Sequence, residues 1–173
     1  FFKTDKLSVL KNGVIRLSTN KEAEERKKEI LDVAEGLFVT KGYESASTTD
    51  ILEKVGIARG TLYYHFKSKE EILDALIDRT IQQIVLNINQ ALKNEDDVVH
   101  KIVAFVGAMK VDSDIGKEIT DYAHKPQNAL MHQKIQKSLL GALTPIAVKV
   151  IEQGNKEGIL DSAYPYEAAE TLL

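Results

Sequence analysis

Apolar residues recur along the chain at the spacing of an amphipathic helix. From Ile30 they fall at i, i+3, i+4, i+7 and i+8, which predicts a helix over 21–41 that Gly42 would end in the left-handed conformation. The same reasoning predicts further helices over 48–55, 59–66, 68–93, 97–110, 112–125 and 128–157, and an eighth that starts near Tyr166. The pattern therefore predicts an all-α protein.

Residues 1–20 do not show this pattern. Two short apolar runs flank Asn12-Gly13, a dipeptide that favours a type I′ hairpin turn, although a lone two-stranded hairpin is only marginally stable in water. An arm, a piece of helix or a sequence foreign to the native polypeptide fits the same residues. The segment carries four basic residues against Asp5 alone, so we define 1–20 as a basic N-terminal extension.

Composition narrows the classes of function. The chain has 173 residues, 43 % of them hydrophobic and 28 % charged, which is typical of a globular protein. It contains no Cys, which excludes disulfides and thiolate metal sites. No apolar run approaches the ~18–20 residues of a membrane span and no signal peptide opens the chain, so we expect a cytoplasmic protein without a membrane partner. The net charge of −3 restricts any nucleic-acid site to a local patch.

Residues 47–73 (STTDILEKVGIARGTLYYHFKSKEEIL) have the pattern of a helix-turn-helix. This motif needs two short helices that cross steeply through a tight turn. Gly56 stands where the turn needs a positive φ, which glycine adopts without steric cost. Apolar residues one helical turn apart occur on both helices and predict a small shared core: Ile51, Val55, Leu62 and Phe66.

The second of these helices leaves an unusual face outside. If Leu62 points inward, the step of about 100° per residue turns Gly60 and Tyr64 outward. Between Arg59 and Lys69 there are three fixed positive charges, one His and no acid. Hydroxyls, rings and cations beside a glycine suit a DNA duplex, whose phosphates and base edges would be the partners. Ordinary packing of the tyrosines against neighbouring helices is the alternative.

Together these residues resemble the DNA-binding domain of TetR-type transcriptional repressors. The resemblance is carried by Thr48-Thr49, Val55-Gly56-Ile57, Gly60-Thr61-Leu62-Tyr63-Tyr64-His65-Phe66 and Ser68-Lys69-Glu70. With the charge pattern, it implies DNA contacts for ten residues: Thr48 and Thr49 at a phosphate, Arg59, Gly60, Thr61 and Tyr64 in the major groove, and Tyr63, His65, Lys67 and Lys69 at the backbone. Two positions depart from the family, because Ala58 stands where a capping Ser is common and Leu52 where Ala is common.

The resemblance also implies a division of the chain. It implies a helix-turn-helix DNA-binding domain over 21–69 and an antiparallel helical ligand-binding and dimerisation domain over 70–173, incomplete at its C-terminus. It further implies repression at a DNA operator, controlled by an unknown small-molecule effector. Because one recognition helix reads only a few base pairs, we expect a homodimer on a palindromic operator. Five side chains are candidates for the effector cavity, although a filled core fits each of them too: Phe105, Met109, Tyr122, Met131 and Leu139.

Two other classes of function compete with this interpretation. The helix-turn-helix pattern also fits a protein-interaction module that binds no DNA. A metal site built from Asp121, His124 and His132 would give a helical enzyme, but Pro126 separates the two histidines and no catalytic motif accompanies them. We therefore expect no enzyme, no cofactor and no metal.

Overall fold

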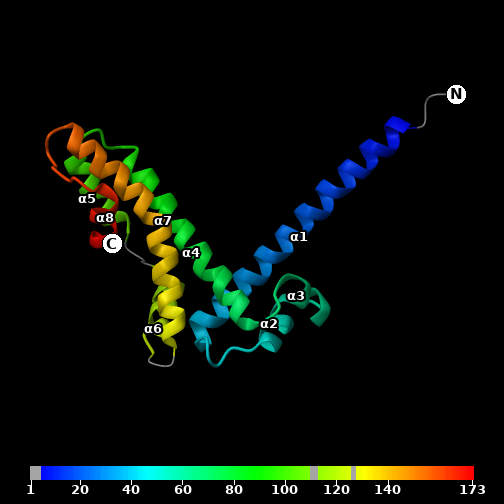
Figure 1. Ribbon diagram of the computed structural model, residues 1–173. Helices are drawn as coiled ribbons and strands as arrows, with labels where there is room; N and C mark the ends of the chain where they lie inside the picture. The colour runs from blue at the N-terminus through cyan, green and yellow to red at the C-terminus, as the bar shows by residue number, and fades with distance from the viewer. Residues whose placement is uncertain (1–4, 110–112, 126–127) are drawn as a thin grey trace. The chain divides into compact units, whose positions relative to one another are not determined.

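The computed structural model describes residues 5–109, 113–125 and 128–173, with side chains from Lys21 onward except that of Leu130. Within these residues the chain forms eight helices and no strand (Figure 1), which confirms the all-α prediction. The helices are α1 (Asp5–Lys41), α2 (Thr48–Val55), α3 (Arg59–His65), α4 (Lys69–Leu92), α5 (Val98–Ala108), α6 (Asp114–Ala123), α7 (Ala129–Lys156) and α8 (Pro165–Leu172). They form two compact units, Phe1–Ile72 and Leu73–Leu173, and α4 begins in the first unit and continues into the second.

Helix α1 starts earlier than the sequence predicts. The predicted start is Lys21, whereas α1 runs from Asp5 to Lys41 and contains Asn12 and Gly13 in its interior. Over residues 5–20 the hairpin interpretation is therefore wrong and the alternative of a piece of helix is correct, while residues 1–4 lie outside the described residues. The physical reason is that Asn and Gly each cost a helix only up to ~1 kcal/mol relative to Ala, so a long helix tolerates both.

The first unit packs α1, α2 and α3 around a small apolar core. Each helix supplies buried side chains: Ile30, Ala34 and Phe38 from α1, Ile51 from α2, and Leu62 and Phe66 from α3 and its C-terminal end. Tyr43 adds an edge-to-face contact with Phe38, with 5.1 Å between the ring centroids. This packing is needed because helices as short as α2 and α3 are not stable alone.

The start and end of α2 are defined by local hydrogen bonds. The Ser47 hydroxyl accepts from the Asp50 amide, and the Asp50 carboxylate accepts from the Ser47 amide at 2.8 Å, which is a capping box. Lys41 pairs with Asp50 at 2.6 Å, and this hydrogen bond, with those from Ser47, holds the pKa of Asp50 well below its usual range. Gly56 ends α2 at a φ of 73° and turns the chain toward α3.

The second unit is organised around α7, which packs against α5, α6 and α8. Its core is a cluster of Ile84 and Ile88 from α4, Phe105 from α5 and Leu143 from α7. Pro165 opens α8 in its first turn, where the missing amide costs nothing. Within the residues that the structure describes, no helix is both long and apolar enough to cross a lipid bilayer.

The turn after α7 is held by backbone hydrogen bonds. The amides of Ile159 and Leu160 both donate to the Gly154 carbonyl at 3.0 Å, and the Asn155 side chain exchanges two hydrogen bonds with the Ser162 backbone. The Leu160 side chain lies so close to the Gly154 backbone that a Cβ there would stand 2.5 Å from Leu160 Cδ1. The packing of this turn therefore depends on the glycine at 154.

Candidate nucleic-acid interface

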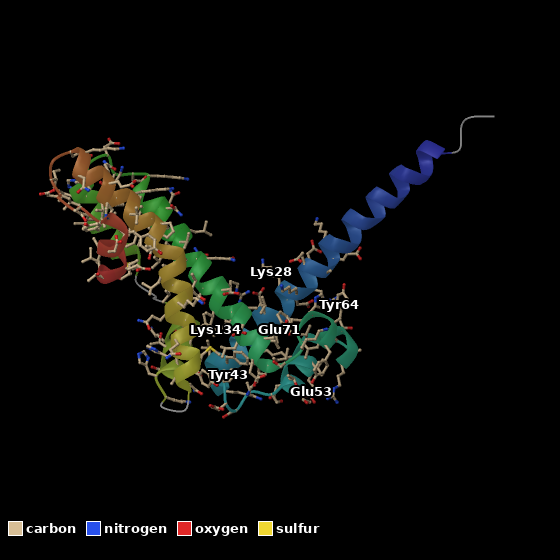
Figure 2. All side chains as sticks on the ribbon, viewed as in Figure 1. Lys28, Tyr43, Glu53, Tyr64, Glu71 and Lys134 are labelled. Carbon is tan, nitrogen blue, oxygen red and sulfur yellow. The ribbon has the colours of Figure 1, made fainter. Side chains whose placement is uncertain are left out.

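Helix α3 has one buried and one open side. Leu62 and Phe66 are buried against the core of the first unit, as the helical spacing predicts. Tyr64, which is labelled in Figure 2, is 73 % exposed, and Gly60 is exposed as well. A Cβ added to Gly60 would meet no atom within 4 Å. Nothing in the packing of the first unit therefore requires a glycine at this position.

Three polar side chains connect α3 to the start of α2. The Arg59 guanidinium lies over the Tyr63 ring, 5.4 Å from its centroid. Hydrogen bonds from Arg59 and then from Thr48 lower the pKa of the Tyr63 hydroxyl. Because Thr48 is the first residue of α2 and Arg59 the first of α3, Tyr63 brings the N-terminal ends of both helices to one surface.

The two ends of α3 are stabilised differently. Ala58 stands before α3 and makes no side-chain cap, as its lack of a hydroxyl predicts. At the other end the Lys67 ammonium donates to the Tyr63 carbonyl at 2.9 Å, which complements the negative end of the helix. At its N-terminal end α3 therefore receives no hydrogen bond from the side chain of its capping residue. At its C-terminal end Lys67 adds a positive charge.

His65 is half-buried beside this face, with its ring edge-on to Tyr64 at 4.9 Å between centroids. Burial lowers the pKa of His65, and the positive charge of Lys27 lowers it further. Both effects disfavour the charged form of the His65 imidazole. Lys27 on α1 adds a positive charge near His65, whereas Arg26 is paired with Glu29 at 2.5 Å and Glu24 opposes both cations. In the sequence the signal of Lys27 is hidden in a run of alternating charges.

Lys69 has a different environment from the one that the resemblance implies. Its ammonium donates to the carbonyls of Tyr43, Ala46 and Glu44 at 2.9, 3.1 and 3.4 Å, and it lies 4.3 Å from the centroid of the Tyr43 ring. An ammonium has three donors, so Lys69 has none left for a phosphate. In the free protein Lys69 therefore ties the first turn of α4 to the loop between α1 and α2, and its phosphate contact stays a prediction.

The ten predicted DNA-contact residues therefore differ in how open they are. Exposed residues are Thr49, Arg59, Gly60, Tyr64 and Lys67, and half-buried residues are Thr48, Thr61, Tyr63, His65 and Lys69. The structure brings the α3 residues and Thr48 onto one surface of the first unit. In the described part of α3 this surface contains no acidic side chain.

The five residues of the predicted effector cavity are not brought together completely. Phe105 belongs to the buried core cluster, and Met109 and Leu139 pack against it. Met109 and Leu139 also line a small apolar cavity of about 130 Å³. Tyr122 and Met131 do not line this cavity, and their place in an effector cavity stays a prediction. Apolar residues of a helical unit look alike in sequence, because the spacing does not say which helices meet.

The histidines considered for a metal site form an edge-on ring pair. His124 and His132 have ring centroids 5.1 Å apart, and His124 Nδ1 lies 2.7 Å from the Thr120 carbonyl. Within the described ranges, no group of three or more His, Cys, Asp or Glu side chains could hold a metal ion. The geometry gives the metal-site alternative no support.

Comparison with known proteins agrees with this geometry. Residues 30–76 match the family described as bacterial regulatory proteins, tetR family, and residues 111–173 match the tetracyclin repressor-like C-terminal domain. The transcriptional activator FasR of Mycolicibacterium smegmatis is 32 % identical over 112 residues, 61 % of this chain and 51 % of that protein. The uncharacterized regulator TtgW of Pseudomonas putida is 30 % identical over 118 residues, 68 % of this chain and 88 % of that protein.

A solved structure of a TetR-family regulator has a similar fold. A TetR-family transcriptional regulator from Syntrophomonas wolfei aligns with a TM-score of 0.67 and 25 % identity, over 86 % of this chain and 78 % of that one. The chain covers only part of the length of many relatives. It spans between 38 % and 55 % of four of the curated proteins that it matches.

Proposed function

We propose, since the chain belongs to the tetR family of bacterial regulatory proteins, that it is a ligand-responsive repressor that binds a palindromic DNA operator as a dimer. The chain is a DNA-binding transcriptional regulator of the helix-turn-helix type, and members of its family are regulators and not enzymes. The proposal places it in the cytoplasm, where bacterial DNA lies. Operator, dimer and repression are the parts that experiment has to decide.

One observation carries the proposal: the outer side of α3 is open at Gly60 and Tyr64 although nothing in the first unit requires it. A glycine in a short helix costs up to ~1 kcal/mol relative to Ala, and an exposed tyrosine gains nothing from the core. Both features are useful if a duplex approaches, because the helix backbone can come close at Gly60 while Arg59 and Tyr64 reach base edges.

The small size of this surface supports a dimer. Helix α3 has seven residues and can cover only a few base pairs. Two copies related by a two-fold axis would place two α3 helices in successive major grooves, ~34–36 Å apart or somewhat more. A ligand in the second unit would favour a state with another spacing, by no more than its difference in affinity for the two states.

In vitro selection of bound DNA from random duplexes tests the proposal. We expect a palindromic consensus whose affinity falls steeply with salt, and the absence of any selected sequence would favour a protein-interaction module instead. A reporter gene behind the selected operator then decides the sign of regulation. Repression predicts lower expression when the regulator is present, whereas its relative FasR is named an activator.

Replacing the two exposed reading residues should weaken specific binding. Arg59→Ala or Tyr64→Ala is expected to lower affinity for the selected operator by ~1–3 kcal/mol, because each would remove a contact to a base edge. Fluorescence anisotropy with operator and scrambled duplexes measures the difference. Tyr164→Ala is the matched control, since Tyr164 is 71 % exposed in the second unit. Equal operator affinities in the Tyr64 and Tyr164 variants would contradict the assignment.

Gly60→Ala separates folding from DNA binding. The added Cβ meets open space in the free protein, so thermal stability should stay unchanged or rise by up to ~1 kcal/mol. If the duplex backbone approaches Gly60 closely, the same methyl group should reduce operator affinity by roughly tenfold, ~1.4 kcal/mol. Gly107→Ala, which is also open but lies on α5, should keep full affinity. Full affinity in Gly60→Ala would exclude a close approach there.

A further inference from the structure

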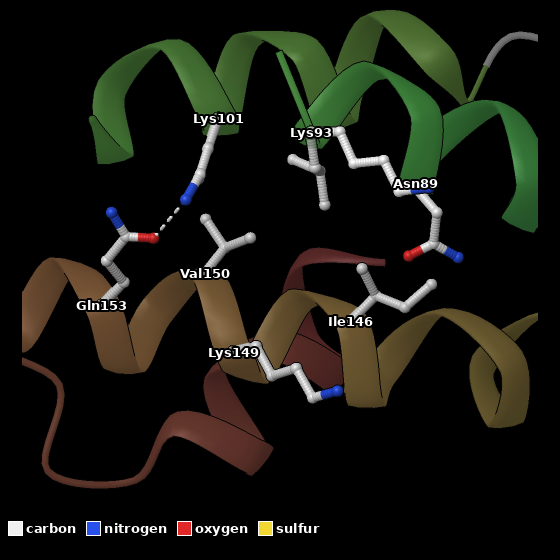
Figure 3. Close-up of a pocket in the computed structure, with 8 residues that line it drawn as sticks. Asn89, Lys93, Lys101, Ile146, Lys149, Val150 and Gln153 are labelled. Carbon is white, nitrogen blue, oxygen red and sulfur yellow. Dashed lines mark hydrogen bonds between the residues drawn. The ribbon is translucent and has the colours of Figure 1, made fainter. Parts of the chain in front are cut away.

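The second unit contains a pocket with lysines from three parts of the chain. It has a volume of about 260 Å³ and lies where α4, α5 and α7 meet (Figure 3). Lys93 follows α4, Lys101 belongs to α5 and Lys149 to α7. We call this site, defined by these three residues, the lysine pocket. The described residues that line it include no acid, although the whole chain has a net charge of −3.

Two of the three ammonium groups have no partner among the residues that the structure describes. Lys93 and Lys149 make no hydrogen bond or ion pair with any residue that the structure describes. Along α7 the neighbours of Lys149 at i−4 and i+4 are Pro145 and Gln153, and Glu152 at i+3 forms no ion pair with it among the described residues. Both cations are therefore available to a bound group.

The third lysine is fixed at the wall of the pocket. Lys101 Nζ donates to Gln153 Oε1 at 2.7 Å, as the dashed line in Figure 3 marks. The Gln153 amide group in turn donates to the Asp96 carbonyl and to the Glu157 carboxylate, and Glu157 also accepts from the Val98 amide. An ammonium has three donors, so Lys101 keeps two for a ligand. Glu157, the acid in this network, accepts one hydrogen bond at each of its oxygens and does not line the pocket.

Part of the lining is apolar, and we call this part the floor of the pocket. Leu92, Ile146 and Val150 line it together with the lysines. Leu92 and Ile146 also pack against the core cluster of the second unit, so the floor is the outer surface of that core. A lining that combines cations with apolar side chains fits a ligand with one charged and one apolar end.

We propose that the lysine pocket binds an organic anion, with phosphate or carboxylate oxygens at the three lysines and an apolar part on the floor. Lysine binds such oxyanions as a compact point charge. The inference deepens the proposed function, on which it rests, because it names the chemical class of the effector. The site is not the cavity predicted from the sequence, since it shares none of the residues assigned to that cavity.

Calorimetric titration of the full chain tests the site with three probes of equal chain length: hexyl phosphate, hexanoate and hexanol. We expect one or both anions to bind, with an affinity that falls as salt rises, and hexanol to bind at least about tenfold more weakly. Preference for hexyl phosphate assigns the ligand to organic phosphates, and preference for hexanoate assigns it to carboxylates. Hexanol binding as tight as that of both anions would overturn the proposal.

Variants that lose lysine charges test whether the anion binds at the lysine pocket. The double variant Lys93→Gln/Lys149→Gln is expected to lower anion affinity by roughly twofold to thirtyfold, since it removes two exposed charges that each contribute modestly to binding. Lys137→Gln removes an exposed lysine of α7 outside the pocket and should leave affinity unchanged. Circular dichroism confirms that all variants are folded. Equal losses in the double variant and in Lys137→Gln would mean nonspecific attraction and would contradict the site.

Operator affinity with and without the bound anion separates this inference from the proposed function. A change that disappears in the double variant supports the effector assignment. Lysine-dependent anion binding without any change in operator affinity would overturn that assignment. Lysine-dependent anion binding by a chain that selects no DNA would remove the proposed function and retain the anion site.

Discussion

Gly154→Ala is expected to destabilise the second unit by ~1–3 kcal/mol, the usual cost of adding a methyl group to a filled site. The new Cβ would stand 2.5 Å from Leu160 Cδ1, 2.7 Å from Cγ and 3.1 Å from Cβ. Moving only the end of the Leu160 side chain does not relieve three such contacts. The Leu160 backbone cannot retreat freely either, because its amide donates to the Gly154 carbonyl. The turn that leads to α8 must therefore shift.

Urea denaturation followed by circular dichroism measures this loss, and hydrogen exchange locates it. Faster exchange is expected in α7 and α8, with little change in α2 and α3. Gly141→Ala is the matched control on the same helix, because a Cβ there meets no atom within 4 Å. That variant should gain up to ~1 kcal/mol from the better helix propensity of Ala. If both variants have the same stability, the close packing of Leu160 on Gly154 is not a constraint.

Lys69→Met should destabilise the first unit by about 2 kcal/mol. Removal of the ammonium leaves the carbonyls of Tyr43 and Ala46 without their donor and ends the contact with the Tyr43 ring. Hydrogen bonds of a charged donor contribute ~1.5–3 kcal/mol, and a cation–π contact adds ~0.5–2 kcal/mol. Because Lys69 is partly exposed, water weakens both contributions, and the expected loss of stability is smaller than their sum. Met keeps most of the apolar length of the side chain, so the loss of stability measures the contribution of the ammonium group.

Hydrogen exchange in α2 and α3 and the salt dependence of operator binding check this prediction together. We expect faster exchange and an unchanged salt slope, because Lys69 contacts carbonyls and not phosphates. Lys67→Met is the control for stability. The Lys67 ammonium makes one exposed hydrogen bond at the end of α3, so its removal should change stability much less than Lys69→Met does. A flatter slope with normal stability for Lys69→Met would restore the phosphate contact that the resemblance implies.

Much of the first unit can be predicted because its signals are local. Ser47 and Asp50 stand three residues apart, as a capping box requires, and Gly56 supplies the left-handed residue that ends α2. The orientation of α3 follows from the 3.6-residue period, which buries Leu62 and leaves Tyr64 outside. In each case the chemistry acts within a few residues, so the sequence contains all of the information needed.

The rest depends on contacts between distant segments. The hydrogen bonds from Lys69 to the Tyr43 and Ala46 carbonyls join segments more than twenty residues apart, and charge patterning alone cannot distinguish them from a phosphate contact. The lysine pocket combines residues from the end of α4, from α5 and from α7. Apolar spacing predicts that these helices bury a face, but it does not predict which faces meet.

The stacking of Arg59 on Tyr63 has a consequence for recognition. A long side chain at a surface loses up to ~2 kcal/mol of rotamer entropy when it is immobilised. The guanidinium of Arg59 is already held by the ring and hydroxyl of Tyr63 before any duplex arrives. In the proposed complex, part of that entropic cost is therefore met during folding, and preorganisation of this kind leaves more of the contact energy for discrimination between base pairs.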